Sequence, residues 1–354
     1  MKTKINKELL LKCIKDGHVI SQKHPYLDLT IYNYSQFVQY EKAWNEVTLM
    51  CRGLILNSNY EIVQRPFGKF FNIDEHDSEY LEDIPNLPFE VYDKLDGSLG
   101  ILYWDDFLSV PTPFIASRGS FTSEQANKAT QMLHTKYMYN WDKLDPTKTY
   151  IFEIIYPENR IVIDYGNSEQ LVLLAIIDTQ TGIDLPLVDI GFPIVKSYDG
   201  IKDFKTLKNL NLENKEGFVI KFIDNTKPSF RVKSKFDEYC RLHRIITNVT
   251  SYDIWECLRH ETGFDEMLDK VPDEFYDWVK DCKNTLQNEF DNLKLEWISR
   301  YDSGKHLTDQ KEFALWAKQW KDSGILFTLR NGKTIDETIW KKVKPSYQKP
   351  FSSK

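Results

Sequence analysis

The chain has 354 residues, of which 41% are apolar and 28% are charged, and its formal net charge is -7. This length is enough for about two domains, each with its own hydrophobic core. The composition excludes a mostly disordered chain, and 15 glycines with 14 prolines are too few for a collagen or a low-complexity linker protein.

The cysteines and the apolar segments favour an intracellular protein. The five cysteines are scattered and form no Cys-x-x-Cys pair, so neither a disulfide framework nor a zinc ribbon is expected. The longest apolar stretch, 171–177, is far shorter than the roughly 18 residues that cross a bilayer. The first residues lack the apolar core of a signal peptide. We therefore expect a cytoplasmic protein without a membrane contact.

Basic residues are concentrated in two segments. Between residues 205 and 244, ten Lys or Arg stand against five Asp or Glu, and the segment 341–354 has five lysines and no acidic residue. Phosphate binding depends on local basic surface rather than on net charge, so these segments are candidates for contacts with a polyanion. The alternative is that they are ordinary solvated faces.

The first two thirds of the chain are typical of strands and turns. Short segments rich in β-branched and aromatic residues, each bounded by turn residues, are expected strands: 51–56, 89–92, 101–104, 150–155, 171–177 and 217–222. Helices are expected at 5–14 and near 123–137. Because helices do not alternate regularly with the strands, the pattern favours an α+β fold of antiparallel sheets over a doubly wound parallel sheet.

Helical spacing takes over after about residue 237. Apolar residues recur on one helical face, with Pro272 suited to the first turn: Phe275, Trp278, Cys282, Leu286, Leu293 and Trp297. Phe313, Trp316 and Trp320 repeat the spacing, and Gly324 is the expected stop. The boundary is placed between domains 1–240 and 241–354. Six of the nine tryptophans lie in this helical part, where they are expected to fill a core; stacking on RNA bases is the alternative for any exposed one.

The segment around Lys94 is the most informative one for chemistry. A strand is expected to end at Lys94, Asp96-Gly97 makes a tight turn, and a second strand follows, as in a hairpin. A deprotonated lysine amine there could attack a phosphorus atom and form a phosphoramidate. Taken alone, Lys-x-Asp-Gly is better explained by an ordinary hairpin with an exposed lysine.

Other charged residues are arranged in an order that suits phosphoryl transfer. Cations must hold a triphosphate, and carboxylates must hold a magnesium ion, often through its water molecules. The candidate residues are Arg52, Lys69 with Phe71, Arg118, Glu153, Glu216, Arg231 and Lys233. Each could be a surface residue, but their joint occurrence in this order favours a common site.

The ordered motifs resemble those of the covalent nucleotidyltransferases, and more narrowly the bacteriophage T4 RNA ligase 1 family. The resemblance extends over about 32–244, and the motifs that carry it are Cys51-Arg-Gly, Lys69-Phe-Phe-Asn, Lys94-Leu-Asp-Gly-Ser, Ile151-Phe-Glu-Ile, Asn159-Arg-Ile-Val-Ile-Asp-Tyr, Glu216-Gly-Phe-Val and Arg231-Val-Lys. The resemblance implies a nucleotidyltransferase (ATP-grasp-like) domain of antiparallel sheets, followed here by an all-helical domain.

The resemblance implies an ATP-dependent RNA ligase that uses Mg²⁺, with Mn²⁺ as the alternative ion. Lys94 becomes a lysyl-adenylate, AMP passes to an RNA 5′-phosphate, and a 3′-hydroxyl displaces AMP. The implied roles are phosphate contact by Arg52, Lys69 with Phe71, Arg118, Arg231 and chiefly Lys233, a close turn at Gly97, and metal organisation by Glu153 and Glu216. Two arginines, Arg118 and Arg231, stand where the family often has lysine, and arginine keeps the charge but changes the geometry.

The helical tail distinguishes this chain from DNA ligases and capping enzymes. DNA ligases and capping enzymes usually carry an OB-fold domain after the last motif, and no such pattern follows residue 244. A DNA ligase, a capping-type enzyme and a catalytically silent nucleic-acid-binding relative stay as alternatives. In the family the tail helps to hold RNA, and some members are specialised for broken tRNA. The resemblance therefore implies the repair of RNA with 5′-phosphate and 3′-hydroxyl ends, in the host cytoplasm if the protein is viral. We expect a monomer. Asp265 and Glu266 are additional candidates for contacts with metal-bound water.

Overall fold

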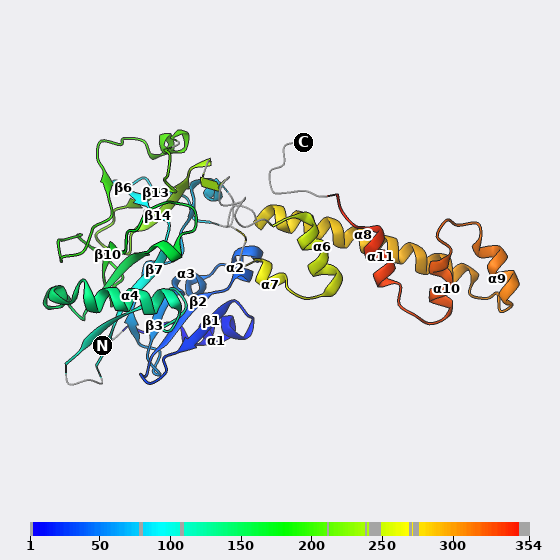
Figure 1. Cartoon of the computed structure of the whole chain (residues 1–354), viewed down its shortest axis with the longest axis horizontal. Helices are drawn as coiled ribbons and strands as arrows, with labels where there is room; N and C mark the ends of the chain where they lie inside the picture. Colours follow the sequence, from blue (N-terminus) through cyan, green and yellow to red (C-terminus); the bar gives the residue numbers. More distant parts are fainter. Residues whose placement is uncertain are drawn as a thin grey trace. The chain divides into compact units, whose positions relative to one another are not determined.

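The structure of the chain, a computed structural model, consists of two compact units (Figure 1). The first unit spans Met1–Ile246 and the second spans Thr247–Lys354. The structure describes residues 3–77, 81–106, 110–210, 212–237, 239–240, 249–268, 271 and 276–346. Among these residues every strand belongs to the first unit, and the second unit consists of helices and their connections.

The N-terminal part of the first unit is a four-stranded antiparallel sheet with the order β1-β2-β3-β4. The helix α1 begins after Asn6, whose side chain accepts a hydrogen bond from the Leu9 N–H, and it buries Leu10 and Cys13. The elements of this part are α1 (Lys7–Lys15), β1 (Val19–Lys23), β2 (Thr30–Tyr34), α2 (Gln36–Glu41), α3 (Glu46–Met50), β3 (Arg52–Leu56) and β4 (Ile62–Gln64).

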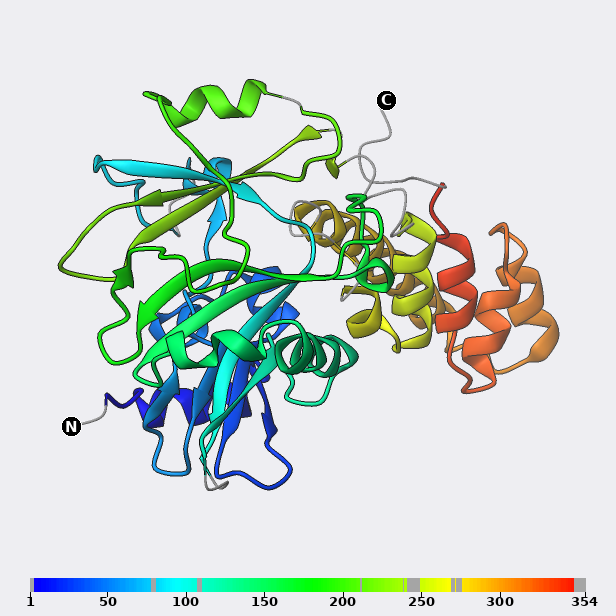
Figure 2. The same ribbon diagram turned by 60° about the vertical axis from the view of Figure 1, so that its left-hand side comes forward.

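A second sheet has five antiparallel strands in the order β11-β10-β9-β7-β8. The helix α4 (Glu124–Thr135) packs against this sheet (Figure 2), where Thr130 Oγ1 accepts a hydrogen bond of 3.1 Å from the Ile115 N–H. Met132 and Phe152 lie in the core between them. The strands are β7 (Ser98–Asp105), β8 (Thr112–Ser117), β9 (Lys148–Ile155), β10 (Gln170–Asp178) and β11 (Asp184–Leu185).

A third sheet has the order β12-β6-β13-β14-β5. Its pairs are antiparallel except for β14 with β5, which run parallel. Its core includes Val91, Phe218, Ile220 and Val232. The strands are β5 (Phe71–Asn72), β6 (Phe89–Lys94), β12 (Ser197–Tyr198), β13 (Gly217–Phe222) and β14 (Phe230–Lys235), and short 3₁₀ segments lie at Ile73–Asp77, Met138–Lys143, Pro157–Asn159 and Phe204–Asn209.

These sheets confirm the predicted α+β class, and each of the six predicted strand segments overlaps a strand. The predicted hairpin at Asp96-Gly97 is wrong. Although β6 and β7 follow each other in the chain, β6 pairs with β12 and β13, whereas β7 pairs with β8 and β9. The chain therefore crosses from one sheet to another directly after Lys94, because residues 95–97 run past Glu153 on β9 instead of folding back on β6.

The second unit contains the helices drawn in yellow to red in Figure 1. Its longest helix, α8, buries Val279, Leu286, Phe290 and Trp297 along one side. The elements are α6 (Ser251–His260), α7 (Phe264–Leu268), α8 (Tyr276–Gly304), α9 (Gln310–Ala317), α10 (Gly324–Arg330) and α11 (Asp336–Lys342). Of the predicted apolar face, Leu286 and Trp297 are buried, so the prediction is confirmed in part.

Two details of the helical prediction differ from the structure. Gly324 does not stop the helix that contains Phe313; that helix ends at Ala317, and Gly324 opens α10. The tryptophans fill the core only partly, since half of the six are buried (Trp255, Trp297 and Trp340). The predicted positions Pro272 and Phe275 lie outside the described residues. No helix in the described part of the chain is long and apolar enough to cross a membrane.

We expect Gly217→Ala to destabilise the first unit. Gly217 has φ +154°, and a Cβ atom there would lie 2.0 Å from the Ser234 carbonyl oxygen of β14. The strands would have to separate, at a cost of about 2–4 kcal/mol in the free energy of unfolding. Urea unfolding measures this cost. Gly166→Ala is the control, because Gly166 also has a positive φ (+62°) but has open space around it; an equal loss for both variants would contradict the steric explanation.

Candidate active site

The described part of the first unit contains a cavity of about 610 Å³. All three sheets contribute to its wall: Arg52 comes from β3, Glu153 from β9, and Lys94 and Arg231 from β6 and β14. Among the predicted site residues, the lining contains Arg52, Lys94, Gly97, Arg118, Glu153, Glu216 and Arg231. The structure therefore brings together groups that are spread over almost 180 residues of sequence.

Lys94 and Glu216 form an ion pair at the wall of the cavity. Lys94 Nζ lies 2.7 Å from Glu216 Oε1, and the Glu216 carboxylate is buried with 4% of its side chain exposed. The antiparallel register places Gly217 opposite Lys94, so the residue before β13 reaches the end of β6. Lys235 of β14 approaches the same carboxylate oxygen at 3.6 Å. One carboxylate is thus shared by two lysines.

Glu153 is the second carboxylate at the wall. Its Oε1 accepts a hydrogen bond of 3.0 Å from the Gly97 N–H. Burial raises the pKa of Glu153 to about 7, and nearby Glu216 acts in the same direction, while Lys94 and Arg52 oppose the rise. Gly97 is required for this contact, because a Cβ atom there would lie 2.6 Å from the Ile154 carbonyl oxygen.

Two arginines lie on one aromatic ring. The guanidinium groups of Arg52 and Arg231 lie 5.1 Å and 4.9 Å from the centroid of Phe67. Arg231 also forms a buried ion pair with Asp184 of β11, which joins the second sheet to the third. Burial acts to raise the pKa of Asp184, but the charge and hydrogen bond of Arg231 outweigh it, and the pKa lies below its ordinary value.

Lys69 lies in a cage of aromatic rings rather than at the cavity wall. Its Nζ is 5.2–5.5 Å from the ring centroids of Tyr34, Trp44 and Phe71. Arg118, which does line the cavity, lies 5.5 Å from the same Tyr34 ring. Tyr34 therefore lies against both predicted phosphate-binding residues, Lys69 and Arg118, and Phe71 contacts Lys69.

The three cations of β14 are placed differently. Arg231, Lys233 and Lys235 alternate along the strand, and the first and last of them line the cavity. Lys233 lies between them with 6% exposure and is outside the lining set. The predicted contact of Lys233 with an α-phosphate stays a prediction.

The carboxylates do not form a ready-made metal cage. Among the described residues no group of three or more His, Cys, Asp or Glu side chains could hold an ion. Glu153 and Glu216 stay the predicted pair for a hydrated magnesium ion, which would be held mainly through its water molecules. Asp265 and Glu266 lie in the first turn of α7 in the second unit, where both are exposed.

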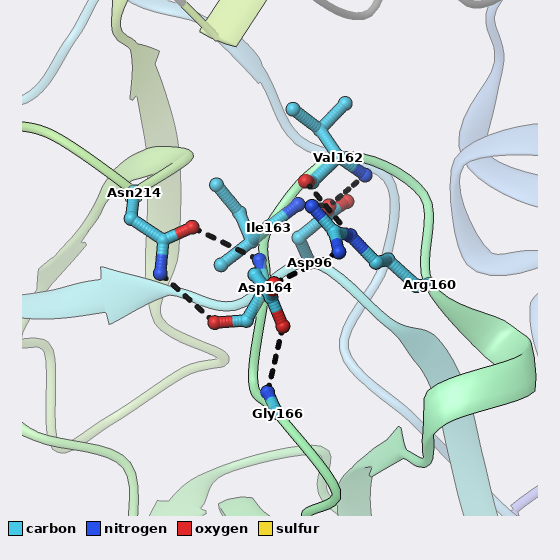
Figure 3. A network of polar contacts seen from close by, with 7 residues as sticks. All are labelled: Asp96, Arg160, Val162, Ile163, Asp164, Gly166 and Asn214. Carbon is cyan, nitrogen blue, oxygen red and sulfur yellow. Dashed lines mark hydrogen bonds and ion pairs between the residues drawn. The ribbon is translucent and has the colours of Figure 1, made fainter.

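A buried network holds the segment that follows Glu153 in the chain (Figure 3). Asp96 Oδ2 accepts hydrogen bonds of 2.8 Å from the N–H groups of both Val162 and Ile163, and its Oδ1 accepts one of 2.9 Å from the Tyr239 hydroxyl. Asp164, which directly follows Ile163, forms two hydrogen bonds with Asn214. Asp96, the third residue of the Lys-x-Asp-Gly motif, therefore anchors structure around Lys94.

Sequence reasoning missed several residues of the site. Phe67 stands two residues before the Lys69 motif, Lys235 stands two residues after Lys233, and Asp184 lies far from any motif. The alternation Arg231-x-Lys233-x-Lys235 was a usable signal for Lys235, because all three share one face of a strand. No local signal distinguishes Asp184, whose role depends on the contact between two sheets.

A lysine, two carboxylates and several cations around one cavity are the groups that a nucleotide-transfer site uses. The model of the RNA ligase family matches residues 50–240, which is more than half of the chain and includes every predicted site residue of the first unit. The chain belongs to the RNA ligase family.

Two relatives show how far the similarity extends. A protein of Thermovibrio ammonificans that is named as a candidate RNA ligase is 30% identical over 207 residues, which cover 55% of this chain and 53% of the relative. The RNA ligase of Rhodothermus phage RM378 is 23% identical over 384 residues, covering 86% of this chain and 85% of the relative. The chain thus spans about half the length of the first relative and most of the second.

Solved structures resemble the chain more weakly. An archaeal ATP-dependent RNA ligase has 16% identity, covers 77% of this chain and 70% of its own, and has a TM-score of 0.46. A mutant RNA ligase of Naegleria gruberi with AMP and Mn has 19% identity, covers 43% and 51%, and has a TM-score of 0.35. The family assignment rests on the sequence match.

We expect the free energy of unfolding of the metal-free protein to fall as pH rises from about 4.5 to about 7, with Glu153 as one cause. Over this range the folded state holds a proton on Glu153 that the unfolded chain has lost, so raising the pH favours unfolding. Glu153→Gln should be more stable than wild type at pH 8 by about 1–3 kcal/mol and equal to it below pH 4. Urea unfolding across pH tests this, with exposed Glu8→Gln as control; parallel curves would contradict it.

We expect Asp184→Asn to leave Arg231 as a buried cation without its carboxylate. The loss in the free energy of unfolding should be about 2–4 kcal/mol, and inorganic pyrophosphate should restore part of it by supplying the missing anion. Thermal unfolding with and without pyrophosphate measures both effects. The control is Asp224→Asn, which alters a more accessible pair with Lys227 in the turn between β13 and β14. The same pyrophosphate response in both variants would argue against the role of Asp184.

Proposed function

We propose that the chain is an ATP-dependent RNA ligase that joins 5′-phosphate and 3′-hydroxyl ends through a lysyl-adenylate. The observation that carries the proposal is the placement of Lys94 at the cavity wall, 2.7 Å from Glu216, within a sequence of the RNA ligase family. The neighbouring arginines provide the positive charge that a triphosphate requires.

The first step is a transfer of AMP to Lys94. The amine loses its proton, Nζ forms a bond to the α-phosphorus of ATP, and the bond to pyrophosphate breaks. Arg52, Arg118 and Arg231 stabilise the charge on the phosphate oxygens, with Lys69 and Lys233 as further contacts in our proposal. Gly97 lets the backbone pass close to Glu153, which keeps that carboxylate directed at the cavity.

Two further transfers complete the reaction. An oxygen of the RNA 5′-phosphate bonds to the phosphorus of AMP and releases Lys94. The RNA 3′-hydroxyl then attacks the activated 5′-phosphate, a phosphodiester bond forms and AMP leaves. Glu153 and Glu216 would organise Mg²⁺, or Mn²⁺, through its waters, and the ion supplies charge neutralisation on the phosphate oxygens.

The two units suggest a division of work. In our proposal residues 1–240 form the adenylyltransferase domain, and residues 241–354 form a helical domain that holds RNA. Broken tRNA is the substrate class we favour, with Asp265 and Glu266 near the metal-bound water during ligation. We further propose a monomer that acts in the cytoplasm.

We expect Lys94→Ala to abolish covalent labelling by α-labelled ATP, because the variant lacks the amine that our proposal assigns as the nucleophile. Labelling is read after a denaturing gel, in protein first freed of bound nucleotide. Lys94→Arg is the matched variant, since it keeps a cation beside Glu216 but is not a nucleophile. Exposed Lys7→Ala is the control and should be labelled like wild type.

The same assay separates the candidate functions. Label from ATP that 5′-phosphorylated RNA discharges supports the RNA ligase. Label from GTP would indicate a capping-type enzyme, discharge by a nicked DNA alone would indicate a DNA ligase, and a folded protein that takes no label would be a silent binding relative. Persistent label in Lys94→Ala would refute the assigned nucleophile.

A further inference from the structure

Hydrogen bonds and ion pairs join three segments beside Lys94 that are distant in the chain, namely 93–96, 160–166 and 214–216. Lys94 pairs with Glu216 at 2.7 Å, and the preceding Asp93 accepts two hydrogen bonds of 2.8 Å from Lys215 Nζ. Neighbouring residues of one segment therefore pair with neighbouring residues of another. This double pairing makes the position of Glu216 depend on the path of residues 214–216.

Asn214 attaches this path to the third segment. Its Oδ1 accepts a hydrogen bond of 2.9 Å from the Asp164 N–H, and its Nδ2 donates one of 2.9 Å to the Asp164 carbonyl oxygen (Figure 3). Asn214 is exposed and has φ +52°, a left-handed conformation that asparagine tolerates. The side chain therefore contributes directed hydrogen bonds rather than buried apolar area.

The partner segment is itself fixed close to the nucleophile. Asp96 accepts hydrogen bonds from the N–H groups of Val162 and Ile163, the two residues directly before Asp164. Asp164 also holds its own loop, through Arg160 at 2.9 Å and the Gly166 N–H at 2.8 Å (Figure 3). The loop thus connects Asp96, two residues after Lys94, to Asn214, two residues before Glu216, through hydrogen bonds.

We propose that Asn214 is a positioning residue for the adenylylation of Lys94. Its two bonds to Asp164 set the register of 214–216, and through it the approach of the Glu216 carboxylate to Lys94. If the chain needed only the left-handed conformation at this position, glycine would serve at least as well. The inference rests on the proposed function, because it assigns a role in the lysyl-adenylate step.

The test is Asn214→Gly, which keeps the backbone conformation and removes both hydrogen bonds. In single-turnover labelling over a range of ATP concentrations, we expect the rate constant at saturating ATP to fall about 10- to 100-fold. The ATP concentration for half-maximal rate should change by less than about threefold. The thermal midpoint should stay at the wild-type value, which a purely structural role would not predict.

Two further variants keep the test decisive. Asn140→Ala removes a similar bond, from Asn140 Nδ2 to the Gly191 carbonyl oxygen at 3.1 Å, between residues outside the cavity lining, and should label at the wild-type rate. Asn214→Asp keeps the acceptor and loses the donor, so its rate should lie below wild type; it decides the question if Asn214→Gly does not fold.

The outcomes separate this inference from the proposed function. Wild-type protein that takes no label from ATP would refute the proposed function itself. Labelled wild type with an unchanged rate constant in Asn214→Gly would refute the positioning role. A change confined to ATP affinity would refute the positioning role as well. So would a loss of labelling that only follows the fraction of unfolded protein.

Discussion

The antiparallel register between β6 and β13 is the constraint on which the site depends. It places Gly217 opposite Lys94 and so brings the Glu216 carboxylate to 2.7 Å from the lysine ammonium. A shift of one residue would turn every side chain of the strand to the opposite face. The close passage of Gly217 against Ser234 of β14 holds the register from the other side, where no Cβ atom fits. The strands that form the core of the third sheet therefore also determine which carboxylate pairs with Lys94.

Several cations of the cavity wall form ion pairs with the protein's own acids. Lys94 pairs with Glu216, Arg231 with Asp184, and Lys221 with Glu90. A polyphosphate that enters must replace these acidic partners. The binding free energy gained from each new contact is therefore reduced by the loss of an existing ion pair. This exchange favours ligands with several closely spaced negative charges over single anions. It also explains how so much positive charge is kept in a folded, partly buried site.

The sequence predicted the local structure better than the pairing between distant segments. The strands around Glu153 and Glu216 were recognisable because β-branched and aromatic residues fill them, and the motif order located the lysine and most of its companions. The hairpin at Asp96-Gly97 was wrong because turn chemistry is the same whether a chain folds back or crosses to another sheet. Asp184, Phe67 and Asn214 could not be found, since their contacts arise only when two sheets or two loops meet. The end of the helix at Ala317 was missed because a glycine signals a break without showing on which side the helix lies.

The bond between Asp96 and the Tyr239 hydroxyl spans 143 residues of sequence. During synthesis the chain emerges N-terminus first at about 5–20 residues per second, so Lys94 precedes this partner by on the order of ten seconds. Glu216 arrives only slightly earlier than Tyr239, and long-range pairings of this kind form late in folding. The lysine is therefore without these neighbours while the next 122 residues, up to Glu216, are made. A nascent chain on the ribosome cannot assemble the cavity until nearly the whole first unit has emerged, just as the helical unit begins to be made.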